Sequence, residues 1–122
     1  MKVLLADDDP DQLSLRSMVL QQSGFETIGA ADDLSAAKLA ASHKPECAVI
    51  DLRLPTEERG LGLICELKRL DPTIHIIVLT GGNPERLARQ PEANLIEEIV
   101  VKGAPSGPLI QTLKSLAARR CV

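Results

Sequence analysis

The stretch VLLADDDP at residues 3–10 decides the fold. Four apolar residues suit a buried β-strand, and three aspartates follow them at once. Asp9 and Pro10 predict the start of a helix, because a carboxylate caps the N–H groups of a first turn and proline fits the first helical position. The stretch therefore predicts a strand that passes through an acidic turn directly into a helix.

The same alternation of strand and helix patterns continues along the chain. Apolar runs at residues 25–30, 47–50, 74–79 and 96–101 predict four more strands, and the run at 74–79 is nearly continuous, as in strands buried on both faces of a sheet. The helices are predicted from apolar spacing and stop signals: Leu15, Met18 and Val19 before Gly24; Leu34, Ala37, Lys38 and Ala41 before Pro45; Leu63, Ile64, Leu67 and Leu70; residues 84–90 before Pro91; and Leu109, Ile110, Leu113 and Leu116 after the capping Ser106.

Five β-α units with short connections predict an α/β fold. Right-handed crossovers then favour a doubly wound, five-stranded parallel sheet in the order 2-1-3-4-5, which is the flavodoxin-like arrangement. Glu97 and Glu98 predict that the fifth strand lies at an edge of the sheet or is partly exposed. The length of 122 residues suits one core, so we expect a single domain over residues 1–122.

Composition and charge argue against several classes of protein. Phe25 is the only aromatic residue, which argues against stacking on single-stranded nucleic acid, and the net charge of −3 argues against binding to a phosphate backbone. No apolar run has the length of a membrane span, and residues 1–3 enter the first strand without a signal peptide. Cys47, Cys65 and Cys121 form no CxxC pair, and their odd number favours reduced thiols; apolar surroundings predict burial of the first two. We therefore expect a cytoplasmic protein that binds neither membrane nor nucleic acid directly.

Polar residues follow four of the five predicted strands at the same position. Asp7 and Asp8 follow the first strand, Asp51 the third, Thr80 the fourth and Lys102 the fifth. Each residue alone has an ordinary explanation as a turn, cap or solvated surface residue. Ligands of open α/β sheets bind outside the carboxyl ends of the strands, however, and the shared register favours one common site there.

The residue types in this predicted site point to phosphoryl chemistry. Because clustered carboxylates repel one another, a hard divalent cation relieves the repulsion, and Mg²⁺ is typically held by one or two carboxylates with waters and phosphate oxygens. Asp9 is expected to be occupied as the helix cap. The Asp51 carboxylate can act as a nucleophile toward a phosphoryl group, while Thr80 and Lys102 can neutralise its charge.

These motifs resemble the receiver domain of two-component response regulators over essentially the whole chain. The resemblance is carried by VLLADDDP at 3–10, AVIDLRLP at 48–55, IIVLTG at 76–81 and VVK at 100–102. It implies a receiver fold and these roles: Asp51 as phosphoacceptor; Asp8, Asp51 and the backbone carbonyl of Arg53 as Mg²⁺ ligands; Asp7 acting on Mg²⁺ through water; Lys102 contacting the phosphoryl group; and Thr80 hydrogen-bonding to it.

The resemblance also implies partners and an output. The phosphoryl donor would be a sensor histidine kinase or a phosphotransfer protein, and the switching surface would comprise the fourth helix, fifth strand and fifth helix. The output would be a downstream effector protein or an output domain beyond Val122, with phosphorylation-dependent homodimerisation as in many relatives. Such a protein would not be an enzyme beyond its own phosphorylation and slow dephosphorylation.

Three departures from the family pattern concern the switch. Gly103 replaces the usual proline after the lysine, which predicts a trans Lys102–Gly103 peptide bond, since a cis bond at a non-proline residue costs about 3 kcal/mol. Ile99 stands where the family often has an aromatic switch residue. The loop at residues 56–60 carries one extra residue, and Arg53 is placed either to pair with the phosphoryl group or to be solvated.

Two other functions are compatible with parts of the pattern. Asp7 and Asp9 form a DxD pair like that of haloacid-dehalogenase-type phosphatases, but those enzymes need a late acidic pair, and none follows the last predicted strand. A receiver-like interaction module without phosphorylation is the second alternative. The sequence contains no GxxxxGKS/T or GxGxxG loop for a nucleotide, and we assign no role to His43 or His75.

Overall fold

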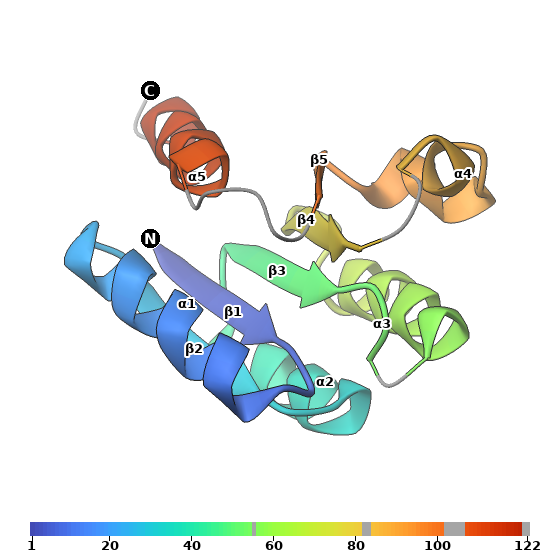
Figure 1. Ribbon diagram of the computed structural model, residues 1–122, viewed down its shortest axis with the longest axis horizontal. Coiled ribbons are helices and arrows are strands. Elements are labelled where there is room, and N and C mark those ends of the chain that lie inside the picture. Colours follow the sequence, from blue (N-terminus) through green and yellow to red (C-terminus); the bar gives the residue numbers. More distant parts are fainter. Residues whose placement is uncertain (55, 82–83, 102–106, 121–122) are drawn as a thin grey trace.

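Five parallel strands form one sheet in the order β2-β1-β3-β4-β5 in the computed structural model (Figure 1). The structure describes residues 1–54, 56–81, 84–101 and 107–120. The elements are β1 (Lys2–Ala6), α1 (Pro10–Gln22), β2 (Glu26–Ala30), α2 (Asp33–His43), β3 (Cys47–Asp51), α3 (Glu57–Leu70), β4 (His75–Thr80), α4 (Pro84–Ala88), the 3₁₀ helix η1 (Pro91–Leu95), β5 (Glu98–Val101) and α5 (Gly107–Arg120). The predicted strand order and the edge position of β5 are confirmed.

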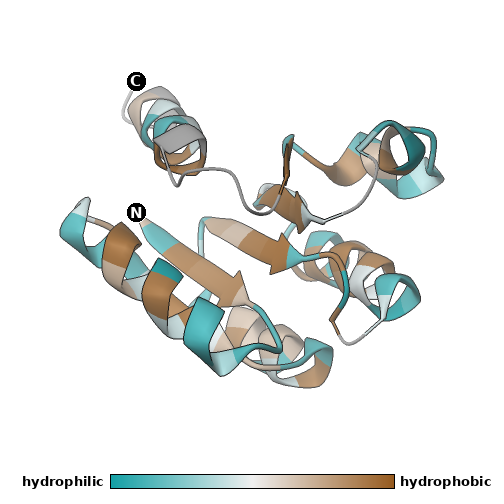
Figure 2. Cartoon of the chain, viewed as in Figure 1, coloured by the Kyte–Doolittle hydropathy of each residue, from teal (hydrophilic) through white to brown (hydrophobic). Residues whose placement is uncertain are grey.

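Helices cover both faces of the sheet, and two apolar clusters fill the layers between. Successive residues of a strand point to opposite faces, so Leu4 and Leu5 of β1 belong to different clusters. One cluster packs the sheet against α2, α3 and α4, and the other packs it against α1 and α5. Figure 2 shows the inner strands as mainly apolar, which follows from burial on both sides. None of the described helices is long and apolar enough to cross a membrane.

In two helices the larger apolar residues that indicated the helical pattern do not face the core. Leu15 and Met18 of α1 are 55% and 56% exposed, whereas Leu20 is buried and Leu13 packs against the core. Arg16 lies on that inner side as well, where its guanidinium group pairs with Asp7. In α2, Leu34 is 66% exposed, and the small side chains of Ala36 and Ala40 face the core instead.

Of the other predictions for the helices and cysteines, some are confirmed and one is wrong. Gly24, with φ of 95°, follows the C-cap of α1 as predicted. Leu63, Ile64 and Leu67 of α3 are buried as predicted, although Leu70 is 39% exposed. Cys47 is buried, but the prediction for Cys65 is wrong, since it lies on the exposed face of α3.

The segment between β4 and β5 differs from the sequence prediction. Residues 84–90 were expected to form one helix closed by Pro91; the structure has α4 ending at Ala88 and a further 3₁₀ turn, η1, that begins at Pro91. Proline tolerates the first position of such a turn because it lacks the N–H that would be unpaired there. Strand β5 consequently begins at Glu98 rather than Ile96. The capping residue Ser106 and the Lys102–Gly103 bond lie outside the described residues.

Candidate functional site

Three carboxylates meet where β1 and β3 end. Strands β1 and β3 pair in parallel with Ala6 opposite Ile50, so the residues that follow, Asp7 and Asp51, emerge side by side at the carboxyl edge of the sheet. One carboxylate oxygen each from Asp7, Asp8 and Asp51 lies within 4.8 Å of the others. Asp7 and Asp51 are buried and Asp8 is exposed, so the cluster opens to solvent on one side.

Asp9 has the capping role predicted for it. Its side chain accepts hydrogen bonds from the backbone N–H groups of Asp11 at 3.0 Å and Gln12 at 3.4 Å, and Pro10 occupies the first position of α1. These bonds satisfy two of the donors at the helix start. Asp9 thereby fixes the direction in which the chain leaves the acidic turn, and it leaves Asp7 and Asp8 to face Asp51.

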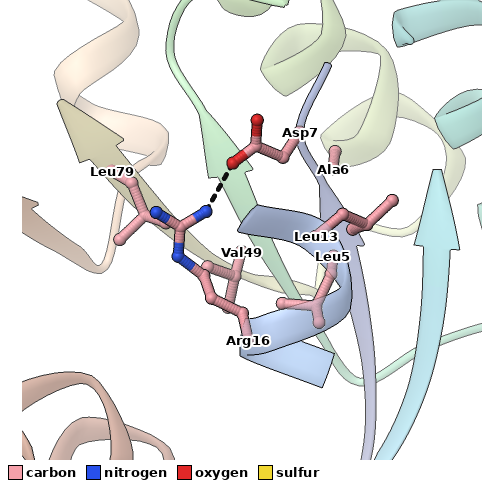
Figure 3. A pocket seen from close by; sticks show the side chains of 7 residues that line it. All are labelled: Leu5, Ala6, Asp7, Leu13, Arg16, Val49 and Leu79. Atoms are coloured by element: carbon pink, nitrogen blue, oxygen red, sulfur yellow. Dashed lines mark hydrogen bonds and ion pairs between the residues drawn. The ribbon is translucent and has the colours of Figure 1, made fainter. Parts of the chain in front are cut away.

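Arg16 is a residue of this region that the sequence analysis missed. Its Nη1 donates to Oδ2 of Asp7 (Figure 3), while Oδ1 of Asp7 accepts the backbone N–H of Asp9 at 2.9 Å. The sequence signal that could have indicated an inward-facing Arg16 is its spacing on α1. It stands three residues after Leu13 and four before Leu20, on the core side of the helix.

Asp51 is held by the segment that follows it. The backbone N–H of Arg53 donates to Oδ1 of Asp51 at 3.2 Å, and the N–H of Leu52 donates to the carbonyl of Leu79 at 2.9 Å, which extends the β3–β4 ladder past Asp51. The Arg53 side chain is exposed, which agrees with the expectation that it is solvated. Gly60 of α3 lies so close to this segment that a Cβ there would stand 2.0 Å from the Leu52 carbonyl oxygen.

Ion pairs tie the start of α3 to its neighbours. Thr56 caps α3 by accepting the backbone N–H of Arg59 at 3.2 Å. The Arg59 side chain makes two bonds to the Asp33 carboxylate of α2, at 3.0 and 2.8 Å. Glu57 pairs with Arg86 of α4, and this hydrogen bond raises the pKa of Arg86. The start of α3 is therefore connected to both α2 and α4. Residues 57–60, which were expected in a loop, belong to this helix.

Thr80 lies at the same edge of the sheet. It is the last residue of β4 and is 4% exposed. Because Leu79 is the register partner of Asp51, Thr80 lies one residue further toward the carboxyl edge on the neighbouring strand. Strand β5 pairs Val101 with Thr80, so the chain reaches this edge again directly before Lys102. Lys102 itself lies outside the described residues.

The donor set fits a small, hard divalent cation. Carboxylate and carbonyl oxygens are the ligands that Mg²⁺ prefers, and one or two carboxylates usually suffice when waters complete the shell. Asp7, Asp8 and Asp51 bring three such carboxylates together. Both oxygens of Asp7 accept hydrogen bonds from the protein, one from the Asp9 N–H and the other from Arg16.

The chain belongs to the response regulator receiver domain family, whose model matches residues 3–114. Its relatives include the transcriptional regulatory protein PrrA of Mycobacterium bovis, which is 30% identical over 121 residues, covering 98% of this chain and 51% of that protein. The chain thus spans about half the length of the curated relatives it matches. It is a receiver domain of the two-component response regulators, homologous to transcriptional regulators of this kind.

Solved structures agree with this assignment. The response regulator TrrA of Thermotoga maritima, in complex with Mg²⁺ and BeF, superposes with a TM-score of 0.83 at 26% identity and covers 94% of this chain and 97% of that one. A response regulator of Burkholderia pseudomallei with a phosphorylated aspartic acid and a calcium ion gives a TM-score of 0.80 at 25% identity, covering 98% and 74%. The flavodoxin-like receiver fold is confirmed.

Proposed function

We propose that this domain accepts a phosphoryl group on Asp51 in a Mg²⁺-dependent reaction and acts as a phosphorylation switch. The observation that carries the proposal is the convergence of Asp7, Asp8 and Asp51 at the carboxyl ends of two adjacent strands. Within the family, two similar structures hold a metal ion, one with BeF and the other with a phosphorylated aspartate. Asp8, Asp51 and the Arg53 carbonyl would bind Mg²⁺ directly, and Asp7 would act on it through water.

The chemistry assigned to Asp51 is a direct displacement at phosphorus. An Asp51 oxygen forms the new O–P bond while the N–P bond of a donor phosphohistidine breaks, and the histidine nitrogen keeps the bonding electron pair. Bound Mg²⁺ supplies positive charge to the phosphoryl oxygens. Burial of Asp51 and the hydrogen bond from Arg53 hold the attacking carboxylate in one orientation, which lowers the cost of reaching the transition state.

Thr80 and Lys102 are assigned to the phosphoryl group once it is attached. Thr80 would donate its hydroxyl to a phosphoryl oxygen, and Lys102 would neutralise part of the added charge. Neither role requires a protein group to gain or lose a proton. We assign the domain the role of a phosphoryl acceptor with slow self-dephosphorylation, without turnover of a separate substrate.

The switching surface is proposed to be α4, β5 and α5. Ile99, which stands where the family often has an aromatic residue, packs against the apolar cluster that contains Leu87 of α4. Glu57 and Arg86 offer a second link, because they join the helix after the acceptor loop to α4. The signal from Asp51 would reach this surface through Thr80, Ile99 and that ion pair in place of an aromatic switch.

The proposed partners follow from the family. The donor would be a sensor histidine kinase or a phosphotransfer protein, and the output would be an effector protein or an output domain, since PrrA and similar relatives are transcription regulators about twice this length. We propose one domain over residues 1–122, a cytoplasmic location and phosphorylation-dependent pairing of two copies. No direct binding to nucleic acid or membrane is assigned to this domain.

The test is incubation with Mg²⁺ and a small-molecule phosphodonor, followed by intact mass measurement. The parent protein should gain one phosphoryl group, Asp51→Asn should gain none, and Asp11→Asn, which removes an exposed aspartate near the same edge, should behave as the parent. An equal gain in Asp51→Asn would refute the assignment. Release of phosphate over many turnovers from a phosphoester would instead favour a phosphatase.

A further inference from the structure

Arg16 lies beside the acidic cluster and has no part in the phosphoryl chemistry proposed above. It stands nine residues after Asp7, on the side of α1 that faces the sheet, and its guanidinium group points at the Asp7 carboxylate (Figure 3). The Asp7 side chain is 2% exposed and the Arg16 side chain 15%. This pair is therefore well shielded from water, unlike the Arg59–Asp33 pair, whose arginine is 48% exposed.

The surroundings of Arg16 make its charge effective at Asp7. Leu5, Leu13, Val49 and Leu79 line the same pocket as Arg16 and Asp7, so the aliphatic stem crosses an apolar wall before the guanidinium group reaches the carboxylate. Charges interact more strongly where apolar groups exclude water. Leaving a buried carboxylate without a partner is costly, and Arg16 removes that cost for Asp7 in the metal-free protein.

The pairing changes the charge balance of the acidic cluster. Among the described residues the cluster brings three carboxylates together, and Arg16 offsets the negative charge of one of them. Oδ2 of Asp7 is occupied by Arg16 and Oδ1 by the Asp9 N–H. For a divalent cation that enters the cluster, the Asp7 carboxylate is already neutralised by Arg16. The guanidinium group of Arg16 also repels the entering cation.

We propose that Arg16 is a built-in counter-cation that sets the Mg²⁺ affinity of the receiver site. It stabilises Asp7 when no metal is bound, and it weakens Mg²⁺ binding by electrostatic competition. The consequence is a site that fills only at higher Mg²⁺ concentration than the three carboxylates alone would require. This inference rests on the proposed function, since it requires Mg²⁺ among Asp7, Asp8 and Asp51. Arg16 is a positioning residue that touches Asp7 and not the reacting atoms.

The test is calorimetric titration of the metal-free protein with MgCl₂, together with thermal unfolding followed by far-UV circular dichroism. Arg16→Gln should bind Mg²⁺ on the order of tenfold more tightly than the parent, since it removes one unit charge near a dication. Its metal-free melting temperature should fall, and Mg²⁺ should raise that temperature by more than in the parent. Arg16→Lys, which keeps the charge, should bind Mg²⁺ nearly as the parent does.

The matched control is Arg59→Gln, which removes an arginine from an exposed ion pair on the neighbouring helix and should leave Mg²⁺ affinity unchanged. Unchanged or weaker Mg²⁺ binding in Arg16→Gln overturns the counter-cation role, and a fall in stability alone indicates a purely structural pair. Absence of Mg²⁺ binding in the parent overturns the proposed metal site as well.

A second measurement keeps the inference testable if Arg16→Gln does not fold. In the parent protein without metal, the guanidinium N–H protons of Arg16 should exchange slowly with solvent, and their ¹⁵N–¹H resonances should shift on Mg²⁺ addition. The corresponding protons of Arg59 should exchange fast, and their resonances should not shift. Arg16 resonances that are unprotected and insensitive to Mg²⁺ would contradict the inference.

Discussion

Gly60 offers a sharp test of how the acceptor loop is packed. A Cβ at Gly60 would stand 2.0 Å from the carbonyl oxygen and 2.9 Å from the carbonyl carbon of Leu52, the residue directly after Asp51. Both atoms belong to the backbone, so a rotamer change cannot relieve the clash. Gly62, two residues further along α3, has no atom within 4 Å of its ideal Cβ. The same substitution is therefore expected to have opposite signs at the two positions.

The expected magnitudes follow from two competing effects. Alanine is a better helix former than glycine by about 1 kcal/mol, which favours both substitutions. Forcing an extra methyl group into a closely packed contact costs about 1–3 kcal/mol or more, and here the contact is with backbone. Gly62→Ala should stabilise the domain by up to about 1 kcal/mol. Gly60→Ala should destabilise it by about 2 kcal/mol, which is the upper end of the packing cost less the helix gain, because the contact is with backbone.

The assay is urea unfolding followed by circular dichroism, because the chain has no tryptophan or tyrosine for fluorescence. Gly60→Ala should also slow phosphorylation by a small-molecule donor, since relief of the clash must move the segment that carries Asp51 and Arg53. Equal stability of the two variants would refute the packing of α3 on Leu52. A destabilised Gly60→Ala that phosphorylates at the parent rate would show that the loop shift does not reach Asp51.

Three further predictions concern local stability. Thr56→Ala should cost about 1 kcal/mol in unfolding free energy, because the hydroxyl that caps α3 is lost, and Thr56→Ser should restore most of it. Leu20→Ala should cost about 2–5 kcal/mol, whereas Leu15→Ala on the same helix should change stability by less than about 0.5 kcal/mol; a cost at Leu15 equal to or above that at Leu20 would contradict the inner face of α1 described here. The hydrogen bonds that Asp32 accepts from Ser35 hold the pKa of Asp32 below its usual value of 3.8. The stability that the charged cap contributes is therefore present above pH 3.8 and is lost as the pH falls through the lowered pKa. The difference in unfolding free energy between the parent and Asp32→Asn should shrink over that acid range and stay constant at neutral pH.

The sheet and the acidic cluster were predictable because both depend on short-range pattern. Alternating apolar runs and caps define five β-α units, and crossover handedness leaves one natural strand order. The residues after each strand must then share an edge, which is why Asp7 and Asp51 were predicted together before any distance was known. The cap at Asp9 was equally accessible, since it needs only one carboxylate ahead of Pro10.

Features that depend on tertiary pairing were missed. The spacing of Leu13, Arg16 and Leu20 fits one helical face, but an arginine is ordinarily counted as an outward residue, so the face with Leu15 and Met18 was chosen instead. The inner face of α2 consists of small alanines, which give a weak apolar signal, whereas the larger apolar residue Leu34 is exposed. The ion pair between Glu57 and Arg86 joins residues 29 positions apart, and nothing local predicts it.

The most direct test of the central claim is chemical location of the phosphoryl group. After phosphorylation with Mg²⁺ present, borohydride reduces an aspartyl phosphate to homoserine, and peptide sequencing by mass spectrometry then locates the converted residue. Conversion at Asp51 alone, dependent on both the donor and Mg²⁺, is the predicted result. Conversion at Asp7 or Asp8, or no conversion at any aspartate under conditions where the protein binds Mg²⁺, would contradict the account.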